Sequence, residues 1–166
     1  LTRQLLPLMQ PGCRVVNTVS CTYAIGRIDP DFFEKGKNGR FFRIPVYGNT
    51  KLALLLFTQE LARRVRDKDI TINASDPGIV STNMITMQAW FDPLTDILFR
   101  PFIKTAAQGA ATAIHLALSD EAKDKNGCCY ANCKKRNVSE RIRNHAQQKQ
   151  LWDDTEVLLR QKGISL

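Results

Sequence analysis

The sequence predicts an α/β fold built around part of a doubly wound parallel sheet, and two observations support this prediction. Three short segments with the apolar, partly β-branched composition of buried strands occur at 14–19, 70–75 and 127–132. Longer segments of helical character lie between and after them, at 47–66 and 105–118. Strands that alternate with helices pair in parallel through right-handed crossovers, so we expect three parallel strands with helices on the faces of the sheet.

The remaining segments are less regular. Residues 1–9 are typical of the end of an amphipathic helix, which a Pro-Gly pair at 11–12 terminates. Residues 21–44 are polar and contain glycine, so we expect a loop there. Four aromatic residues of this loop either anchor it to the body of the protein or line a site for a hydrophobic substrate. They are Phe32, Phe33, Phe41 and Phe42. A polar terminal helix is expected from Ser139, with an interruption near Asn144.

The helix at 47–66 carries apolar residues around most of its circumference. A helix of this kind must be buried on several sides. We expect one side to pack on the sheet and another on a neighbouring helix or on a second subunit, and the sequence leaves these two alternatives open. The helix at 105–118 begins with a capping box formed by Thr105 and Gln108, and its small residues suit close packing on a sheet.

The chain has 166 residues, a net charge of +8 and 43% hydrophobic residues. That hydrophobic content excludes intrinsic disorder as a class. The basic residues at 63–66 lie at the end of a helix, where cations suit the helix dipole, and those at 134–136 form a short turn. Neither group is interleaved with aromatic residues as in a nucleic-acid groove. We therefore expect a solvated basic surface and no nucleic-acid partner.

The cysteines and histidines do not form the pattern of a metal site. The five cysteines are odd in number and include no C-x-x-C pair, and His115 and His145 are isolated. A four-ligand zinc set is therefore poorly supplied, and we expect no metal site but free thiols in a reducing compartment. The longest apolar run, residues 52–57, is far too short to cross a bilayer.

The most informative residues are Tyr47 and Lys51, one turn apart on one face of the helix. A nearby cation favours the ionised form of a phenol, which suits a tyrosine to general acid–base chemistry. Ser20 ends the first predicted strand, and a Pro-Gly pair at 77–78 follows the second. In an open α/β sheet, ligands bind at the carboxyl ends of the strands, so these residues are expected to meet there.

This order of elements, a strand with Ser20, then Tyr47-x-x-x-Lys51, then a strand with Pro77-Gly78, resembles the catalytic half of the short-chain dehydrogenase/reductases. The residues after Lys51 and the late Leu151-Trp152 pair resemble the retinol-dehydrogenase-like branch. The resemblance implies a Rossmann-like sheet whose N-terminal cofactor-binding half is missing, because the chain contains no glycine-rich phosphate loop. We expect residues 1–166 to form a single partial domain, the C-terminal part of such an enzyme.

The resemblance also implies roles for individual residues. Tyr47 would be the general acid or base, Lys51 would favour its ionisation and bind the nicotinamide ribose, and Ser20 would donate a hydrogen bond to the substrate oxygen. The cofactor-binding set would comprise Tyr47, Lys51, Pro77, Gly78, Ile79 and Thr82. Asp76 stands where this branch commonly has His, which would reshape the pocket.

The expected function is hydride transfer between NADP(H), or alternatively NAD(H), and a lipophilic alcohol or carbonyl compound such as a retinoid, steroid or lipid aldehyde. Residues 81–102 resemble the mobile substrate lid of these enzymes. The resemblance further implies a homodimer through the 47–66 helix, and membrane association only through the missing N-terminal segment. We expect a location in the cytoplasm or on the cytoplasmic face of the endoplasmic reticulum. The alternative is a truncated fragment that acts by protein interaction without catalysis.

Overall fold

The computed structural model describes residues 1–30, 32–33, 43–80 and 103–164. It contains a sheet of four strands in the order β1-β2-β3-β4. The strands are β1 (Arg14–Thr18), β2 (Thr71–Asp76), β3 (Cys129–Ala131) and β4 (Lys134–Lys135). β1 pairs with β2 in parallel, and β2 pairs with β3 in parallel. The predicted α/β class and the three parallel strands are therefore confirmed.

The fourth strand was not predicted. β4 runs antiparallel to β3 after a turn of two residues, Asn132 and Cys133, whose φ angles are 52° and 57°. Two successive positive φ angles are the geometry of a type I′ hairpin turn. Asn132 therefore lies in this turn rather than in the predicted strand. A strand of two lysines has no apolar alternation, so its sequence carries no strand signal.

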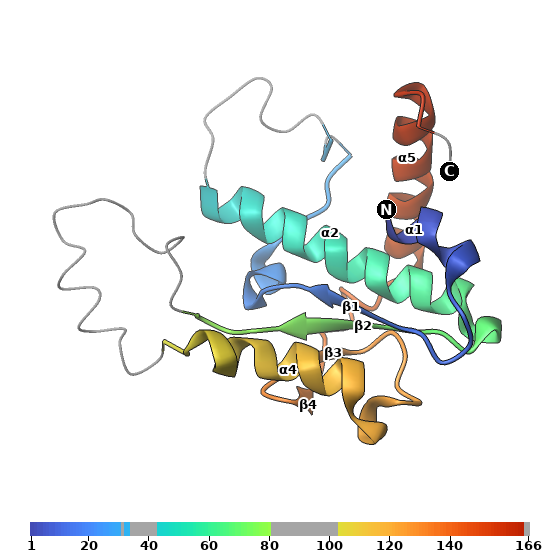
Figure 1. Cartoon of the computed structure of the whole chain (residues 1–166). Coiled ribbons are helices and arrows are strands. Elements are labelled where there is room, and N and C mark those ends of the chain that lie inside the picture. Colours follow the sequence, from blue (N-terminus) through green and yellow to red (C-terminus); the bar gives the residue numbers. More distant parts are fainter. Residues whose placement is uncertain (31, 34–42, 81–102, 165–166) are drawn as a thin grey trace, which may run out of the picture.

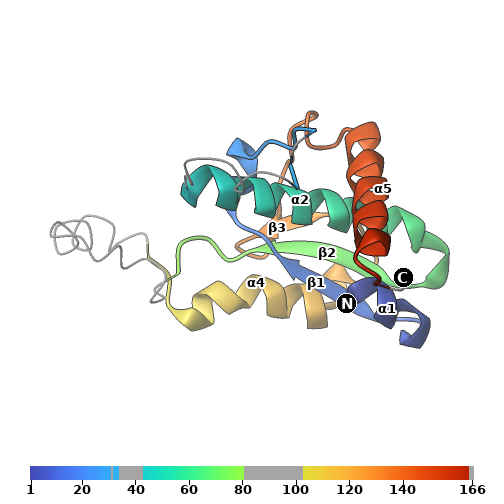
Figure 2. The same ribbon diagram turned by 90° about the horizontal axis from the view of Figure 1, so that it is seen from above.

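Helices cover both faces of the sheet. α2 (Arg43–Arg64) packs on one face and α4 (Ala106–Leu118) packs on the other, as Figures 1 and 2 show. On the α2 side, the core contains Leu52, Leu55 and Leu56 packed on Ala74 of β2. On the α4 side, Leu116 packs on Tyr130 of β3. The predicted capping box at the start of α4 is present in full.

The limits of α2 differ from the prediction at both ends. The helix begins at Arg43, before Tyr47, because Pro45 is tolerated in the first turn, where its missing N–H would have no partner. It ends at Arg64, and a short 3₁₀ helix, η3 (Arg66–Lys68), follows. The predicted burial on several sides is confirmed, since α2 contacts the sheet and also α5 (His145–Gln161).

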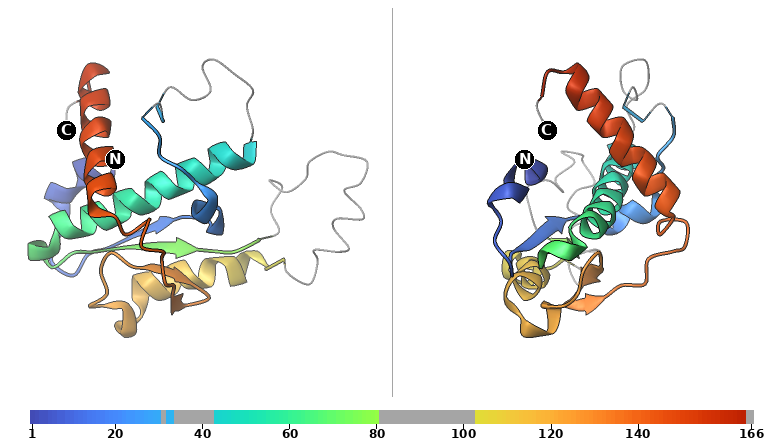
Figure 3. Two further views of the ribbon diagram at one scale, coloured as in Figure 1. Left: turned by 180° about the vertical axis from the view of Figure 1, so that it is seen from behind. Right: turned by 90° about the vertical axis from the view of Figure 1, so that its right-hand side faces the viewer.

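The two terminal segments lie together beside the C-terminal part of α2 (Figure 3). α1 (Thr2–Leu5) and the 3₁₀ helix η1 (Leu6–Leu8) lead into β1. Arg3 forms an ion pair with Glu156 of α5, and the Trp152 ring stacks on Phe57 of α2 at 5.6 Å between centroids. The terminal helix was predicted from Ser139 with an interruption near Asn144. The structure has a turn at 140–143 and α5 starts at His145, so the interruption is confirmed and the helical start at Ser139 is not. The cap of α5, Asn144, accepts hydrogen bonds from the amides of the first turn, which sets the start.

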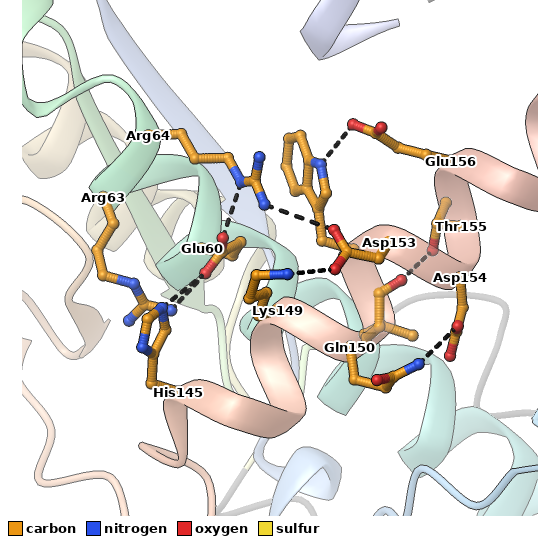
Figure 4. A network of polar contacts seen from close by, with 12 residues as sticks. Glu60, Arg63, Arg64, His145, Lys149, Gln150, Asp153, Asp154, Thr155 and Glu156 are labelled. Atoms are coloured by element: carbon orange, nitrogen blue, oxygen red, sulfur yellow. Dashed lines mark hydrogen bonds and ion pairs between the residues drawn. The ribbon is translucent and has the colours of Figure 1, made fainter.

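A buried acidic side chain joins α2 to α5. Glu60 is buried and accepts hydrogen bonds from Arg63 at 2.6 Å and Arg64 at 2.7 Å, with His145 at 3.6 Å (Figure 4). Burial by itself would raise the pKa of the Glu60 carboxyl, but the two arginines outweigh it and hold this pKa below its ordinary value. Beside this cluster, the buried Gln148 donates to Gln59 at 2.7 Å. The contacts of Glu60 with His145 and of Gln59 with Gln148 join α2 to α5.

Glu60→Gln is expected to lower the free energy of unfolding by about 1 kcal/mol at pH 7, a value kept small because both guanidinium groups are partly exposed to solvent. Because the pKa of Glu60 is lower in the folded state, its ionised form stabilises the folded protein at pH values above the unfolded-state pKa of about 4.3. This stabilisation is lost as the pH falls through the folded-state pKa. Urea unfolding at pH 7 and at pH 3.5 measures the effect. An equal difference between wild type and variant at both pH values would contradict the assignment.

Within the described ranges, no helix combines the length and the apolar character that crossing a membrane would need. All five cysteines are free thiols, and Cys129 is the buried one among them.

Candidate active site

The carboxyl ends of β1 and β2 lie side by side and form the floor of the candidate site. The amide of Val19 donates to the carbonyl of Ser75 at 2.9 Å, so the parallel pairing continues one residue beyond β1. Ser20 follows on one strand, and Pro77-Gly78 follow on the other. The structure thus brings these predicted site residues to one edge of the sheet, where open α/β sheets bind ligands.

Ser20 caps a short 3₁₀ helix, η2 (Cys21–Ile25). Its Oγ accepts a hydrogen bond from the amide of Thr22 at 3.4 Å. This contact uses an acceptor lone pair of the hydroxyl and leaves its single hydrogen available for donation. Ser20 is half-buried, so its hydroxyl is held by the cap and can donate to a ligand oxygen.

Lys51 reaches from α2 to the end of β1. Its Nζ donates to the carbonyl oxygen of Thr18 at 3.0 Å, two residues before Ser20. The same Nζ lies 5.5 Å from the centroid of the Tyr47 ring. An ammonium group can donate three hydrogen bonds. Among the described residues, Lys51 donates one of them, to the carbonyl of Thr18. Lys51 therefore connects Tyr47 to the strand end that carries Ser20.

A close approach of backbones fixes η2 against the first turns of α2. A Cβ added to Gly26 would lie against the carbonyl of Gly48, 2.8 Å from its carbon, and 2.9 Å from Cβ of Leu52. Such distances do not occur between real Cβ atoms and backbone, so only glycine fits at Gly26. This contact sets how the segment that begins at Ser20 sits relative to Tyr47.

The turn after β2 is held by side chains on two sides. Gly78 has a φ of 77°, which favours glycine, and its amide donates to Oδ1 of the buried Asp76 at 2.9 Å. On the other side, Nζ of Lys104 donates to the carbonyl of Pro77 at 2.8 Å and to Oδ1 of Asn132 at 2.6 Å. No sequence pattern marks Lys104 or Asn132 as a site residue, beyond the position of Lys104 directly before a helix cap.

A second tyrosine lies close to Ser20 but has a different environment. Tyr23 of η2 is buried, and burial, together with the neighbouring Cys129 to which it is hydrogen-bonded, raises its pKa to about 12. Burial, and after it the charge of Asp76, raises the pKa of the Cys129 thiol to about 11. Both groups therefore stay protonated at neutral pH and are unsuited to exchange protons there. Tyr47, in contrast, has 39% of its surface exposed.

Ile79 and Thr82, the remaining predicted cofactor contacts, follow Gly78 in the sequence. Ile79 lies beyond the turn and is exposed, and Thr82 lies outside the described residues. Phe32 and Phe33 pack against the core, as an anchor would, and also line an apolar groove of about 580 Å³ between α1, α2 and α5. The residues lining this groove do not include Ser20, Tyr47 or Lys51. Phe41, Phe42 and the predicted lid at 81–102 lie outside the described residues.

The residues at the sheet edge fit the nicotinamide end of a dinucleotide. Gly78 turns the chain at the carboxyl end of β2 with a φ of 77°, so Pro77 and Gly78 bring backbone to the edge of the sheet where ligands bind in open α/β sheets. The remaining donors of Lys51 suit ribose hydroxyls, and the hydroxyls of Tyr47 and Ser20 suit one substrate oxygen. The donor set thus suits chemistry in which a proton is exchanged with an alcohol oxygen and a hydride with the carbon that bears it.

Comparisons with known proteins agree with this geometry. The short chain dehydrogenase family profile matches residues 34–90. The chain is 38% identical over 140 residues to retinol dehydrogenase 12 of Mus musculus, covering 84% of this chain and 43% of that protein. It is 34% identical over 166 residues to retinol dehydrogenase 14 of Homo sapiens, covering 96% and 48% respectively. The chain spans about half the length of the curated relatives it matches.

Solved structures share the fold. A putative uncharacterized protein from Mycobacterium Paratuberculosis superposes with a TM-score of 0.71 at 25% identity, covering 96% of this chain and 54% of that chain. A short chain dehydrogenase from Burkholderia cenocepacia J2315 in complex with NADP superposes with a TM-score of 0.53 at 22% identity, covering 74% and 45%. The predicted C-terminal part of a Rossmann-like sheet is confirmed by these likenesses.

Proposed function

Because the chain belongs to the short-chain dehydrogenase/reductase family, in its retinol-dehydrogenase-like branch, we propose that residues 1–166 are the catalytic half of an oxidoreductase. Its reaction interconverts an alcohol and a carbonyl compound. One observation carries the proposal. Nζ of Lys51 donates to the carbonyl of Thr18, two residues before Ser20, and lies 5.5 Å from the centroid of the Tyr47 ring, which supports a shared site for the three residues.

The residues have separate tasks in the proposed reaction. Tyr47 passes a proton to the carbonyl oxygen in reduction and takes it back in oxidation. The Ser20 hydroxyl donates a hydrogen bond to the same oxygen, where negative charge develops in the transition state. The Lys51 ammonium places positive charge beside the Tyr47 ring and offers donors to a ribose. Pro77 and Gly78 provide the surface on which the nicotinamide rests, and the bound cofactor supplies or accepts the hydride.

NADP(H) is the proposed cofactor, with NAD(H) as the second choice, and a lipophilic alcohol or aldehyde is the proposed substrate. The names of the curated relatives, which are retinol dehydrogenases, support a lipophilic substrate. The structural likeness to a dehydrogenase in complex with NADP, and to a blue fluorescent protein in complex with NADPH, is consistent with NADP(H). A homodimer through α2, and a location in the cytoplasm or on the cytoplasmic face of the endoplasmic reticulum, remain part of the proposal.

The test uses the protein in the length in which the cell makes it. NADPH consumption is followed by absorbance with retinal, a steroid ketone and a medium-chain lipid aldehyde, and NADH is compared at the same concentrations. We expect turnover that requires one of these carbonyl compounds and that is faster with NADPH. The absence of any turnover with either cofactor, in a protein that is folded by circular dichroism, would contradict the proposal.

A second candidate function is interaction without catalysis. The observation in its favour is the apolar groove between α1, α2 and α5, which lies apart from the sheet edge. In this case the chain would pair its α2 surface with a longer subunit of the same family. The activity assay separates the two candidates, because an interaction protein consumes no NADPH while still associating with the longer subunit in sedimentation experiments.

A further inference from the structure

Lys104 lies where three segments of the candidate site meet. Its amide donates to the carbonyl of Ile79 at 2.8 Å, and its backbone pairs in parallel with Val80. The next residue, Thr105, caps α4. The backbone of Lys104 is therefore fixed both to the chain that leaves β2 and to the start of α4, so its side chain starts from a defined position.

The Lys104 ammonium joins the turn after β2 to the turn between β3 and β4. Its two acceptors are the Pro77 carbonyl at 2.8 Å and Oδ1 of Asn132 at 2.6 Å. Hydrogen bonds from a charged donor are shorter and stronger than those between neutral groups. The second acceptor is itself anchored, because the amide of the following residue, Cys133, donates to Oγ1 of the buried Thr112 on α4 at 3.2 Å.

The end of the same lysine side chain lies where a side chain at Gly78 would project. A Cβ added to Gly78 would be 3.1 Å from Nζ and 3.2 Å from Cε of Lys104. Gly78 thus combines a φ of 77° with close contact to this side chain. The bond from the Gly78 amide to Asp76 shapes the turn from within, since these residues are two apart. Lys104 instead ties the turn to other elements of the fold.

We propose that Lys104 is a positioning residue that locks the Pro77-Gly78 turn against the β3–β4 turn and so holds the surface for the nicotinamide. The inference rests on the proposed function, because it takes Pro77 and Gly78 as the nicotinamide contacts. Removing the ammonium frees the Pro77 carbonyl and lets the turn move relative to the end of β1, which leads to Ser20 and is bonded by Lys51 of α2. The cofactor then binds more weakly, because Lys104 acts on it through the position of Pro77 and Gly78.

The test compares Lys104→Met, which keeps most of the stem and removes the charge, with Lys134→Met, which removes an exposed lysine of β4. Amide hydrogen exchange of residues 78–80 is measured in the free protein, and NADPH affinity is measured by fluorescence. For Lys104→Met we expect exchange at 78–80 to rise about tenfold or more, the factor for losing a charged hydrogen bond, and NADPH affinity to fall about tenfold. Lys134→Met should change neither, and Lys104→Arg should restore part of the protection.

Asn132→Ala gives an independent variant, because it removes the second acceptor and leaves the lysine in place. We expect a smaller rise in exchange at 78–80 than for Lys104→Met. If the exchange rates of residues 78–80 are unchanged in Lys104→Met, the proposal that Lys104 holds the turn is wrong. If the NADPH affinity of this variant is unchanged, the proposal that Lys104 supports cofactor binding is wrong. If the wild type binds no NADPH, the proposed function fails, and the exchange result still decides whether Lys104 holds the turn.

Discussion

Tyr47→Phe is expected to lower turnover by about a hundredfold to ten-thousandfold, the usual contribution of a general acid or base. The ring remains, so its contact with the Lys51 ammonium is kept, and only the group that exchanges the proton is removed. Cofactor affinity should therefore stay within about twofold of the wild type. Steady-state kinetics with NADPH and a carbonyl substrate, together with a fluorescence titration, measure both quantities.

Tyr130→Phe is the matched control for this substitution. Tyr130 is buried between β3 and α4, on the side of the sheet away from α2, and it also has a phenol to lose. Removing the Tyr130 hydroxyl should change the free energy of unfolding but leave the turnover of the folded enzyme near the wild-type value. Wild-type turnover in Tyr47→Phe would contradict the assignment of the general acid, whatever the control shows.

Gly26→Ala is expected to lower the free energy of unfolding by about 2 kcal/mol or more, because overpacking against backbone has no flexible partner that can yield. The added methyl would meet the Gly48 carbonyl and Leu52, so η2 or the first turns of α2 must shift. This shift moves Ser20 relative to Tyr47. A misplacement of about 1 Å costs about a hundredfold in rate, so turnover should fall as well.

Gly12→Ala separates the clash from the general cost of replacing a glycine. Gly12 has a φ of 83°, but no atom lies within 4 Å of an added Cβ. We expect a loss of about 1 kcal/mol from backbone strain and no change in the turnover of the folded protein. Equal effects of Gly12→Ala and Gly26→Ala on turnover, measured below the unfolding temperature of both, would show that the η2–α2 contact does not position the site.

Strong local patterns predicted most of the fold. The strand at 14–19, the helix that carries Tyr47 and Lys51, and the capping box at Thr105 combine composition, period and end signals, and each lies within a few residues of its predicted place. Asn144 shows why the chain is interrupted near this residue, as predicted, and why α5 begins only at His145. The stretch from Ser139 has helical character, but the Asn144 side chain bonds the next amides and begins a new helix there.

The candidate site was partly predictable for a similar reason. Ser20, Tyr47 and Pro77 follow from strand ends and from a spacing of four residues, which a sequence displays directly. The contact between Lys104 and Asn132 joins residues 28 positions apart through a turn whose strand, β4, has only two residues. No local pattern marks such a pair, because it depends on how α4 and the hairpin pack around the end of β2. The close approach of Gly26 to Gly48 is likewise a tertiary contact.

The most direct test of the central claim is a crystal structure of the protein, in the length in which the cell makes it, with NADP⁺ and a lipophilic alcohol bound. The account predicts one alcohol oxygen within about 3.2 Å of both Tyr47 Oη and Ser20 Oγ, the reach of a hydrogen bond. It also predicts the nicotinamide against Pro77 and Gly78, with Lys51 on the ribose. An alcohol bound instead in the groove between α1, α2 and α5, with Tyr47 and Ser20 contacting different groups, would contradict it.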